Sequence, residues 1–393
     1  MAKKQHLYEI DLMRGVIMLC VLSVHTLARF IEMQPQNVTR PLFYMGGVIS
    51  SLHFTRESFM FITGLVLFVT YYRRDFRPVQ FWKKRFLLVG IPYVVWTVVY
   101  ILFEGQYTVS FDWSAGVVLK DIGHSLLFGD QFYLYYVLVT IQLYILFPFL
   151  VYALRRLERW HLYIFIGSFL FEVFLMYVTK FTLPHIKASS LPVVLRYIDV
   201  YHERFILTYQ FWFVSGGIIA CHYKEILAYF DRHKLLLPIT LPMCLVLFLG
   251  HYVLDWSVLH ENGMAYTVMQ PIMVPYSLLV TTVMWRSGVQ WARRRENPGW
   301  VPFSKFVAVA SKTSFGIFLI QPFPLYLMET AIKHMHVPGW IHFSLIPVCV
   351  LFVYFSSMFV AYWIGKTPLL AYCVGQRVNL RRRSPESVST AAS

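Results

Sequence analysis

Residues 12–31 read LMRGVIMLCVLSVHTLARFI, an apolar run that carries two arginines and one histidine. A helix of about 20 mainly apolar residues crosses the hydrocarbon core of a bilayer. Similar runs recur along nearly the whole chain of 393 residues, of which 58% are hydrophobic, and the mean hydropathy is +0.55. The sequence therefore predicts an all-α, polytopic integral membrane bundle.

The apolar runs predict about ten transmembrane helices. Their expected positions are residues 12–31, 47–72, 82–103, 132–153, 161–179, 204–222, 235–254, 268–286, 306–328 and 341–364. We expect residues 1–374 to form one transmembrane domain. Residues 375–393 are rich in arginine and serine and are expected to form a disordered cytoplasmic tail.

Lysine and arginine are distributed unevenly between alternate connections. One side of the predicted topology carries 24 of them outside the spans, and the other side carries 6. Because positively charged connections stay in the cytoplasm, both termini are expected to be cytoplasmic. The longest connections on the opposite side are residues 104–131 and 180–203, and the second is a candidate cover for an outward-facing site.

The net charge of +15 does not indicate a nucleic-acid partner, because the basic residues follow the topology and no nucleic-acid-binding motif is present. Attraction to anionic lipid headgroups is sufficient to explain the charge. The 5 cysteines form no CxxC pair and none lies in a predicted external connection. We therefore expect no disulfide framework and no metal site.

Three polar residues share one stripe of the first predicted helix. Arg14 and His25 are eleven residues apart, which leaves them about 20° out of alignment and ~16 Å apart along the helix. Asp11 lies close to the same line and can pair with Arg14 at i, i+3. His25 is expected past the bilayer midplane, where a histidine is either a hydrogen-bonded structural residue or a functional one. Arg14 alone can also serve as an interfacial anchor.

The second predicted helix carries His53, Arg56 and Glu57 on one face. That face is expected to point into the bundle, either as a buried ion-pair network or as part of a site. Glu172 lies in the fifth predicted span, and its partner cannot be assigned from the sequence.

The second cytoplasmic connection is the most basic one. It contains Arg73, Arg74, Lys83, Lys84 and Arg85. Topology alone explains such a connection. The functional alternative is that these residues attract a phosphorylated cytoplasmic ligand.

Five stretches of this sequence, taken in order, resemble motifs of the bacterial membrane acyltransferases called acyltransferase family three. They are EIDLMRG at residues 9–15 followed by His25, FMFITG at 59–64, FWKKRF at 81–86, QLYILFP at 142–148 and SFGIFLI at 314–320. The resemblance covers roughly residues 9–365. The first-helix pattern is the most specific of the five.

The sequence departs from the family pattern at three places. The histidine that follows the last motif in the family is Gln321 here, and the family's His-Leu-Trp before the fourth helix is replaced by residues 133–135, Tyr-Leu-Tyr. A second arginine common at the start of the third helix is Leu88. These departures resemble a subgroup near the exopolysaccharide-modifying members.

The resemblance implies O-acyl transfer in the cell membrane of a bacterium. The acyl group, usually acetyl, would pass from cytoplasmic acyl-CoA, a co-substrate rather than a bound cofactor, to a hydroxyl of a cell-surface or secreted glycan. The membrane domain would act alone or with a separate extracytoplasmic transferase.

A mechanism consistent with the residues starts with the CoA phosphates on the basic connection at residues 73–85. Arg14, held by Asp11, would line the path inward, and His25 would act as general base or as covalent acyl carrier. Arg56 or Glu57 would orient His25 or polarise the thioester carbonyl.

Two other functions remain open at this stage. A polysaccharide or lipid-linked sugar exporter would also have many helices, a polar interior and abundant aromatic residues, which make up 18% of this chain. Transporters often contain inverted repeats, and none is visible here. The other alternative is a non-catalytic scaffold whose polar stripe is structural.

Overall fold

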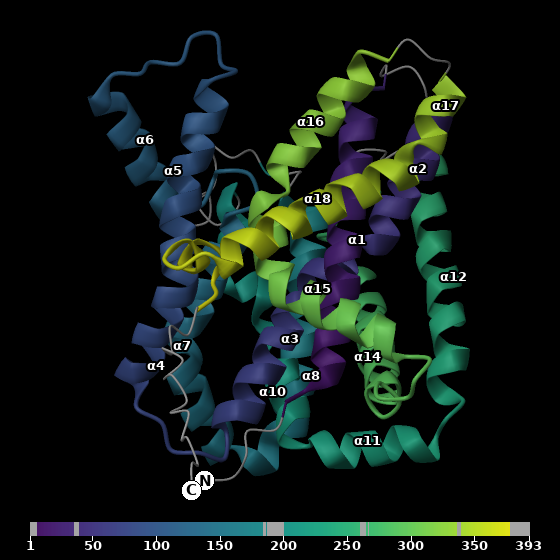
Figure 1. The fold of residues 1–393 in the computed structure, drawn as a ribbon. Coiled ribbons are helices and arrows are strands. Elements are labelled where there is room, and N and C mark those ends of the chain that lie inside the picture. The colour runs from purple at the N-terminus through teal and green to yellow at the C-terminus, as the bar shows by residue number, and fades with distance from the viewer. Residues whose placement is uncertain are drawn as a thin grey trace, which may run out of the picture.

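The computed structural model describes residues 6–34, 39–183, 186, 200–259, 265, 267–335 and 339–377, and within these ranges it contains helices and no strand (Figure 1). The α-helices are α1 Tyr8–Glu32, α2 Thr39–Leu52, α3 Phe54–Tyr71, α4 Pro78–Arg85, α5 Ile91–Gly105, α6 Ala115–Phe128, α7 Tyr135–Arg156, α8 His161–Tyr177, α10 Gln210–Cys221, α11 Tyr223–Arg232, α12 Leu236–Ser257, α14 Met273–Ala292, α15 Val301–Ile320, α16 Pro322–Lys333, α17 Gly339–Ser344 and α18 Ile346–Lys366. Short π or 3-10 segments are η1 Phe86–Gly90, η2 Glu158–Trp160, η3 Val178–Thr182, η6 His202–Arg204, η7 Ile206–Tyr209 and η8 Leu370–Val374.

The predicted all-α membrane fold is confirmed. Among the described residues, 8 helical stretches are long and apolar enough to cross a membrane, and each matches one of the predicted spans. The other two predicted spans, residues 204–222 and 268–286, correspond to a shorter apolar helix, Ile206–Cys221, and to α14. The count of ten spans therefore stays a prediction.

Two predicted spans are broken inside. The second is divided between α2 and α3, with His53 at the junction, and the ninth is divided between α15 and α16 at Gln321. Pro322 follows Gln321 directly and occupies the first turn of α16, where proline is favoured because its missing N–H needs no helical partner. Hydropathy alone predicted one continuous span over residues 306–328 and did not indicate the break at Gln321.

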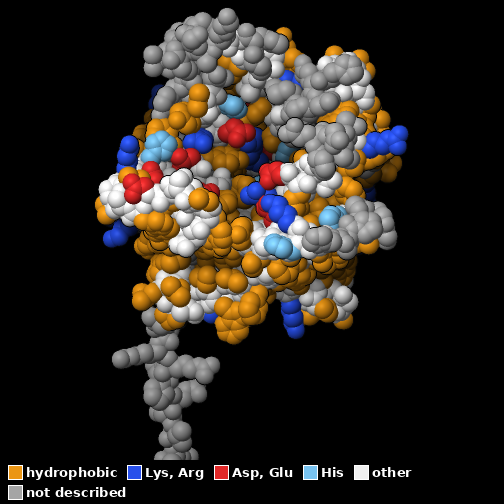
Figure 2. Space-filling model, turned by 90° about the horizontal axis from the view of Figure 1, so that it is seen from above, with side chains coloured by type: hydrophobic (Ala, Val, Ile, Leu, Met, Phe, Trp, Pro, Cys, Tyr) orange, Lys and Arg blue, Asp and Glu red, His pale blue; other side chains and the backbone are white. Residues whose placement is uncertain are grey.

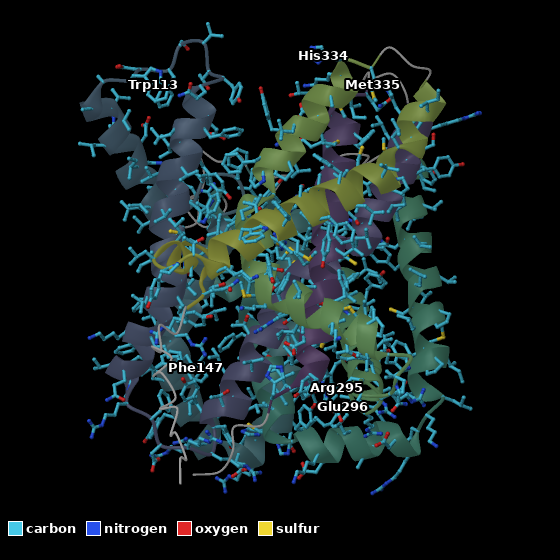
Figure 3. All side chains as sticks on the ribbon, viewed as in Figure 1. Trp113, Phe147, Arg295, Glu296, His334 and Met335 are labelled. Carbon is cyan, nitrogen blue, oxygen red and sulfur yellow. The ribbon has the colours of Figure 1, made fainter. Side chains whose placement is uncertain are left out.

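The bundle has two faces, which we name after the helices that lie there. The α11 face contains α11, the start of α1 and residues 73–77, 157–160 and 293–300, and the α6 face contains residues 106–114, the end of α16 and α17 (Figure 1). Figure 3 places Arg295 and Glu296 toward the first face, and Trp113 and Met335 at the second. The α11 face is the one predicted to be cytoplasmic; residues 1–5 and 378–393 lie outside the described part of the chain.

Helices α3 and α10 pack with their backbones in contact. A Cβ atom at Gly64 would overlap the carbonyl oxygen of Phe213, and one at Gly216 would overlap the carbonyl oxygen of Phe61. Small residues allow membrane helices to approach this closely. In a bilayer the hydrophobic effect does not drive helices together, and close packing of this kind stabilises their contact instead. We call the contact of Gly64 and Gly216 with the opposite backbones the glycine seam.

Helix α18 crosses the bundle obliquely and is followed by η8, which turns back against α5, η1 and α15 (Figure 1). Trp96 donates its indole N–H to the carbonyl oxygen of Cys373 (2.8 Å), and the Gln376 amide donates to the carbonyl oxygen of Lys312 (3.1 Å). Gly375 has a φ of +68°, a conformation that glycine adopts without strain. The first residues of the predicted tail are therefore fixed against the bundle.

Candidate functional site

A large cavity in the described part of the chain has a volume of about 1050 Å³ and lies between α1, α3, α7, α15 and η1. On α1 it extends from Tyr8 to His25, which corresponds to about 25 Å along the helix axis. Asp11, Arg14 and Met18 lie between these ends. One cavity, polar at both ends of this stretch, therefore runs from the α11 face deep into the bundle.

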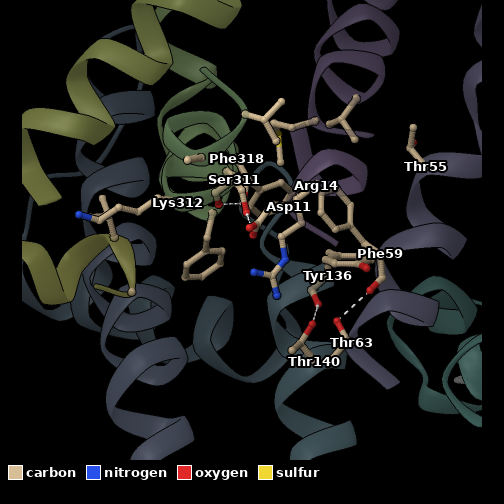
Figure 4. A pocket seen from close by; sticks show the side chains of 18 of the residues that line it. Asp11, Arg14, Thr55, Phe59, Thr63, Tyr136, Thr140, Ser311, Lys312 and Phe318 are labelled. Atoms are coloured by element: carbon tan, nitrogen blue, oxygen red, sulfur yellow. Dashed lines mark hydrogen bonds between the residues drawn. The ribbon is translucent and has the colours of Figure 1, made fainter. Parts of the chain in front are cut away.

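Asp11 is held between two other side chains. Ser311 of α15 donates a hydrogen bond to Asp11 Oδ1 (2.7 Å), and the Nε2 atom of His6 lies 2.5 Å from Oδ2 (Figure 4). Within the described residues, no ion pair joins Asp11 to Arg14. Asp11 therefore connects α1 to α15, and it does not clamp Arg14 as the i, i+3 spacing suggested.

Arg14 points into the cavity in the region of Tyr136 and Thr140 (Figure 4). Its guanidinium group makes no hydrogen bond or ion pair with another described residue. Arginine presents five N–H donors in a planar fork that matches phosphate and carboxylate oxygens. The arrangement leaves these donors available to a ligand.

Arg85 lines the same cavity and directly precedes a wider stretch of helix. Residues Phe86–Gly90 form a π-helical segment, and Leu88 and Val89 also line the cavity. The Arg85 guanidinium lies over the rings of Phe81 (5.6 Å) and Tyr144 (5.4 Å), while its Nε–H is buried without a hydrogen-bond partner. Single π-helical turns of this kind occur frequently at functional sites.

Two lysines of α15 extend the positive charge of the cavity. Lys305 and Lys312 line it, are exposed, and form no ion pair within the described residues. Arg295 also lines the cavity, but it is paired with Glu296 and lies over the Tyr8 ring. The sequence interpretation missed both lysines, although their spacing of seven residues places them on one face of a helix.

His25 lies at the deep end of the cavity. Its ring stacks on the Tyr133 ring with a centroid distance of 3.8 Å and an interplanar angle of 27°. Neither ring nitrogen of His25 has a hydrogen-bond partner among the described residues. Stacking fixes the ring plane and leaves both nitrogens free to exchange a proton with a ligand.

Tyr133 is presented to His25 by a tight turn. Gly129 ends α6 with a φ of +60°, and Phe132 has a φ of 44°. A non-glycine residue at positive φ costs free energy and is frequent at functional sites. Tyr133 belongs to the Tyr-Leu-Tyr sequence that replaces the family's His-Leu-Trp.

Arg56 and Glu57 behave differently from His25. Arg56 lines the cavity and pairs with Glu203 (3.2 Å) and Glu57 (3.9 Å). Glu57 is buried behind Arg56, does not line the cavity and makes no contact with His25 that would orient it. Glu203 comes from the predicted external connection at residues 180–203, much of which lies outside the described residues.

The predicted phosphate-binding connection is largely separate from the cavity. Arg73, Arg74, Lys83 and Lys84 are exposed and do not line it, whereas Arg85 does. Glu172 accepts a hydrogen bond from Gln210 (3.2 Å), a partner that the sequence did not reveal. Gln321 is buried at the break between α15 and α16 and lies away from the cavity.

The α6 face collects charged side chains. Figure 2, which looks down on this face, shows acidic, basic and histidine side chains gathered over its middle, within a largely hydrophobic surround. Arg29 contributes ion pairs with Glu32 (2.8 Å) and Glu329 (3.7 Å). A polar ligand that approaches from the α6 face would therefore also contact polar groups.

Comparisons with known proteins identify the family of this chain. No curated protein and no solved structure matches this sequence. The profile of acyltransferase family 3, described as an acyltransferase domain, matches residues 7–366, nearly the entire chain. The chain therefore belongs to acyltransferase family 3, and it is a multi-pass membrane acyltransferase by its family and its long apolar helices.

Proposed function

We propose that this protein is an O-acyltransferase that moves an acyl group, in the simplest case acetyl, from acyl-CoA to a hydroxyl of a cell-surface or secreted glycan. The donor enters from the α11 face and the acceptor from the α6 face. One observation carries the proposal: a single cavity joins two guanidinium groups without anionic partners, Arg14 and Arg85, to the unpartnered imidazole of His25.

The donor phosphates bind to cavity cations in this proposal. Arg14, Arg85, Lys305 and Lys312 are available, while Arg56 and Arg295 are already paired. Charge-assisted hydrogen bonds from arginine to phosphate are short and strong. This set replaces most of the basic connection as the expected phosphate site and retains Arg85 from it.

His25 acts as the general base. An imidazole nitrogen accepts the proton of the glycan hydroxyl while the hydroxyl oxygen attacks the thioester carbon. The C–S bond then breaks, the new ester C–O bond remains, and the imidazolium returns its proton to the CoA thiolate. Arg56, whose backbone carbonyl accepts a hydrogen bond from Tyr136 (3.2 Å), lies at the same cavity to stabilise the developing oxyanion.

The test substitutes His25→Ala and His25→Gln in the full-length protein in membranes. The rate of acyl-CoA consumption and the ester-linked acyl content of surface glycans, measured by mass spectrometry, should each fall about 10²- to 10⁴-fold. His124→Ala is the matched control, because His124 is exposed on α6 and outside the cavity. Thermal unfolding verifies that each variant is folded.

Three results would overturn parts of this proposal. Unchanged transfer in folded His25→Ala protein would exclude His25 as the base. Disappearance of the glycan chains themselves, rather than of their acyl groups, would indicate export instead of transfer. Transfer to a non-glycan acceptor alone would remove the assigned substrate.

A further inference from the structure

A second cavity lies at the α11 face, outside the site described above. Its volume is about 650 Å³, and it is enclosed by α11, the first turns of α12, and the last turns of α14 with the residues that follow. Arg293 and Arg294 line this second cavity, whereas the next residues, Arg295 and Glu296, line the main one. The two cavities therefore lie on either side of one short segment.

The second cavity is strongly positive. Arg286, Arg293, Arg294 and Lys234 line it against one carboxylate, that of Asp231. Arg286 and Arg293 (3.2 Å) both bind this carboxylate, and their hydrogen bonds and charges lower the pKa of Asp231. This single carboxylate offsets only one of the four positive charges.

Arg286 has a hydrogen-bond donor without an acceptor. Its side chain is only 11% exposed, and its Nη1 group is buried without a hydrogen-bond partner. A buried unpaired donor is unfavourable, more so when it is charged, and a ligand that accepts a hydrogen bond from it relieves that penalty. Arg294 and Lys234 form no ion pair within the described residues and lie exposed at the rim.

One wall of the cavity is apolar. Leu237, Pro238 and Leu241 on α12 and Val283 on α14 form it, and the rest of the uncharged lining is Phe230, His233, Ser287 and Gln290. Beyond them α12 carries exposed apolar side chains, including Ile239 (62% exposed), Met243 (60%) and Val246 (69%). Because α12 is one of the membrane-spanning helices, the cationic pocket lies where its apolar, lipid-facing surface begins.

We infer that this cavity binds the phosphate of an anionic phospholipid, with the acyl chains lying along α12. The geometry places guanidinium donors at the start of α12, next to the exposed apolar surface of that helix. Basic pockets between transmembrane helices are a known way to bind lipid phosphates. A free phosphate would use the cations but gain nothing from the apolar wall and the adjoining lipid-facing surface.

The experiment measures lipid binding to the purified full-length protein in neutral detergent. Dioleoylphosphatidylglycerol is compared with dioleoylphosphatidylcholine, and affinity is read from native mass spectra. The double variant Lys234→Gln/Arg294→Gln should bind phosphatidylglycerol about tenfold more weakly, because each interfacial cation contributes to the attraction of an anionic lipid. Within the described residues, neither side chain has an ion-pair or hydrogen-bond partner whose loss would disturb folding.

Lys224→Gln/Arg232→Gln is the matched control. Both residues lie on α11 at the same face and outside the cavity, so the control removes equal charge. Its affinity should equal that of the wild type. An equal loss in both double variants would overturn the inference in favour of unspecific charge attraction, as would equal binding of the two lipids.

Two further measurements separate the alternatives. Competition by glycerol 3-phosphate that displaces phosphatidylglycerol completely would overturn the assignment to a lipid and indicate a soluble phosphate ligand. A photoactivatable phosphatidylglycerol should label peptides of α12 and α14 in the wild-type protein, and labelling spread evenly over all spans would contradict the site. Both readouts are independent of acyl transfer, so failure of the proposed function leaves them interpretable.

Discussion

Helix α3 meets α10 on one side and the main cavity on the other. Toward α10, Gly64 touches the backbone of Phe213 with no space for a side chain. Toward the cavity, Phe59, Thr63 and Arg56 line an open volume of about 1050 Å³. Ser58 also hydrogen-bonds Thr281 of α14 (2.5 Å), which fixes the helix from a third direction.

The side of α3 that meets α10 fixes the position of the helix, and the side that meets the cavity carries the chemistry. Backbone contact at the glycine seam holds α3 at a fixed distance from its neighbour without using any polar side chain. The cavity side presents the polar side chains of Arg56 and Thr63; Arg56 pairs with Glu203, and Thr63 donates to the carbonyl oxygen of Phe59. Substitutions on one side should therefore change stability, and those on the other should change transfer.

The largest effect is expected from filling the glycine seam. Gly64→Ala or Gly216→Ala places a Cβ atom inside the space of a backbone carbonyl, which cannot move as a side chain can. We expect a loss of about 3 kcal/mol or more in the free energy of unfolding, read as a large drop in Tm or as absence of folded protein. Gly167→Ala on α8 is the control, since nothing lies within 4 Å of its Cβ position. Normal Tm for Gly64→Ala would disprove the close approach.

A smaller effect, on donor binding alone, is expected from the cavity cations. Arg14→Gln and Arg85→Gln should each raise the KM for acyl-CoA about 10- to 100-fold, because each removes a charge-assisted hydrogen bond to phosphate. Arg73→Gln/Arg74→Gln should leave KM unchanged, as both side chains are exposed outside the cavity. The reverse result would restore the basic connection as the phosphate site.

Tyr133 should affect turnover more weakly. Tyr133→Leu removes the ring stacked on His25, so the imidazole loses its fixed plane and kcat should fall up to about tenfold with KM unchanged. Tyr133→Phe retains the ring and should retain kcat. A fall in both variants would show that the hydroxyl, rather than the stacking, is what matters.

The smallest effect concerns the ion pair of Arg56 and Glu203. The charge of Arg56 lowers the pKa of the Glu203 carboxyl below its ordinary value of 4.5. The pair therefore stabilises the fold fully above that pH, and the contribution is lost as the pH falls through the lower pKa of the folded protein. Glu203 is 46% exposed, so Glu203→Gln should cost at most about 1 kcal/mol at pH 7. The Tm values of variant and wild type should converge toward pH 3, and a constant difference would refute the assignment.

The sequence predicted the fold well because hydropathy and helix length decide which segments enter a membrane. It also selected residues that the structure places together, since Asp11, Arg14 and His25 follow the helical period along one stripe. It did not reveal the partners, because ion pairs such as Arg56 with Glu203 join segments whose contact depends on tertiary packing. Charge density in a connection likewise does not show which side chains turn inward, and of the five residues predicted to bind phosphate only Arg85 lines the cavity. Lys305 and Lys312 were missed because the sequence does not show which face of α15 meets the cavity.

The segment after α18 determines where this chain tolerates truncation. Val374, Gly375 and Gln376 form part of the cavity wall, although the family match ends at residue 366. A chain shortened to the matched residues would leave the indole of Trp96 without its acceptor and open the cavity beside Leu88. A tag or fusion partner should therefore be joined after residue 377, so that Val374, Gly375 and Gln376 keep their places in the cavity wall.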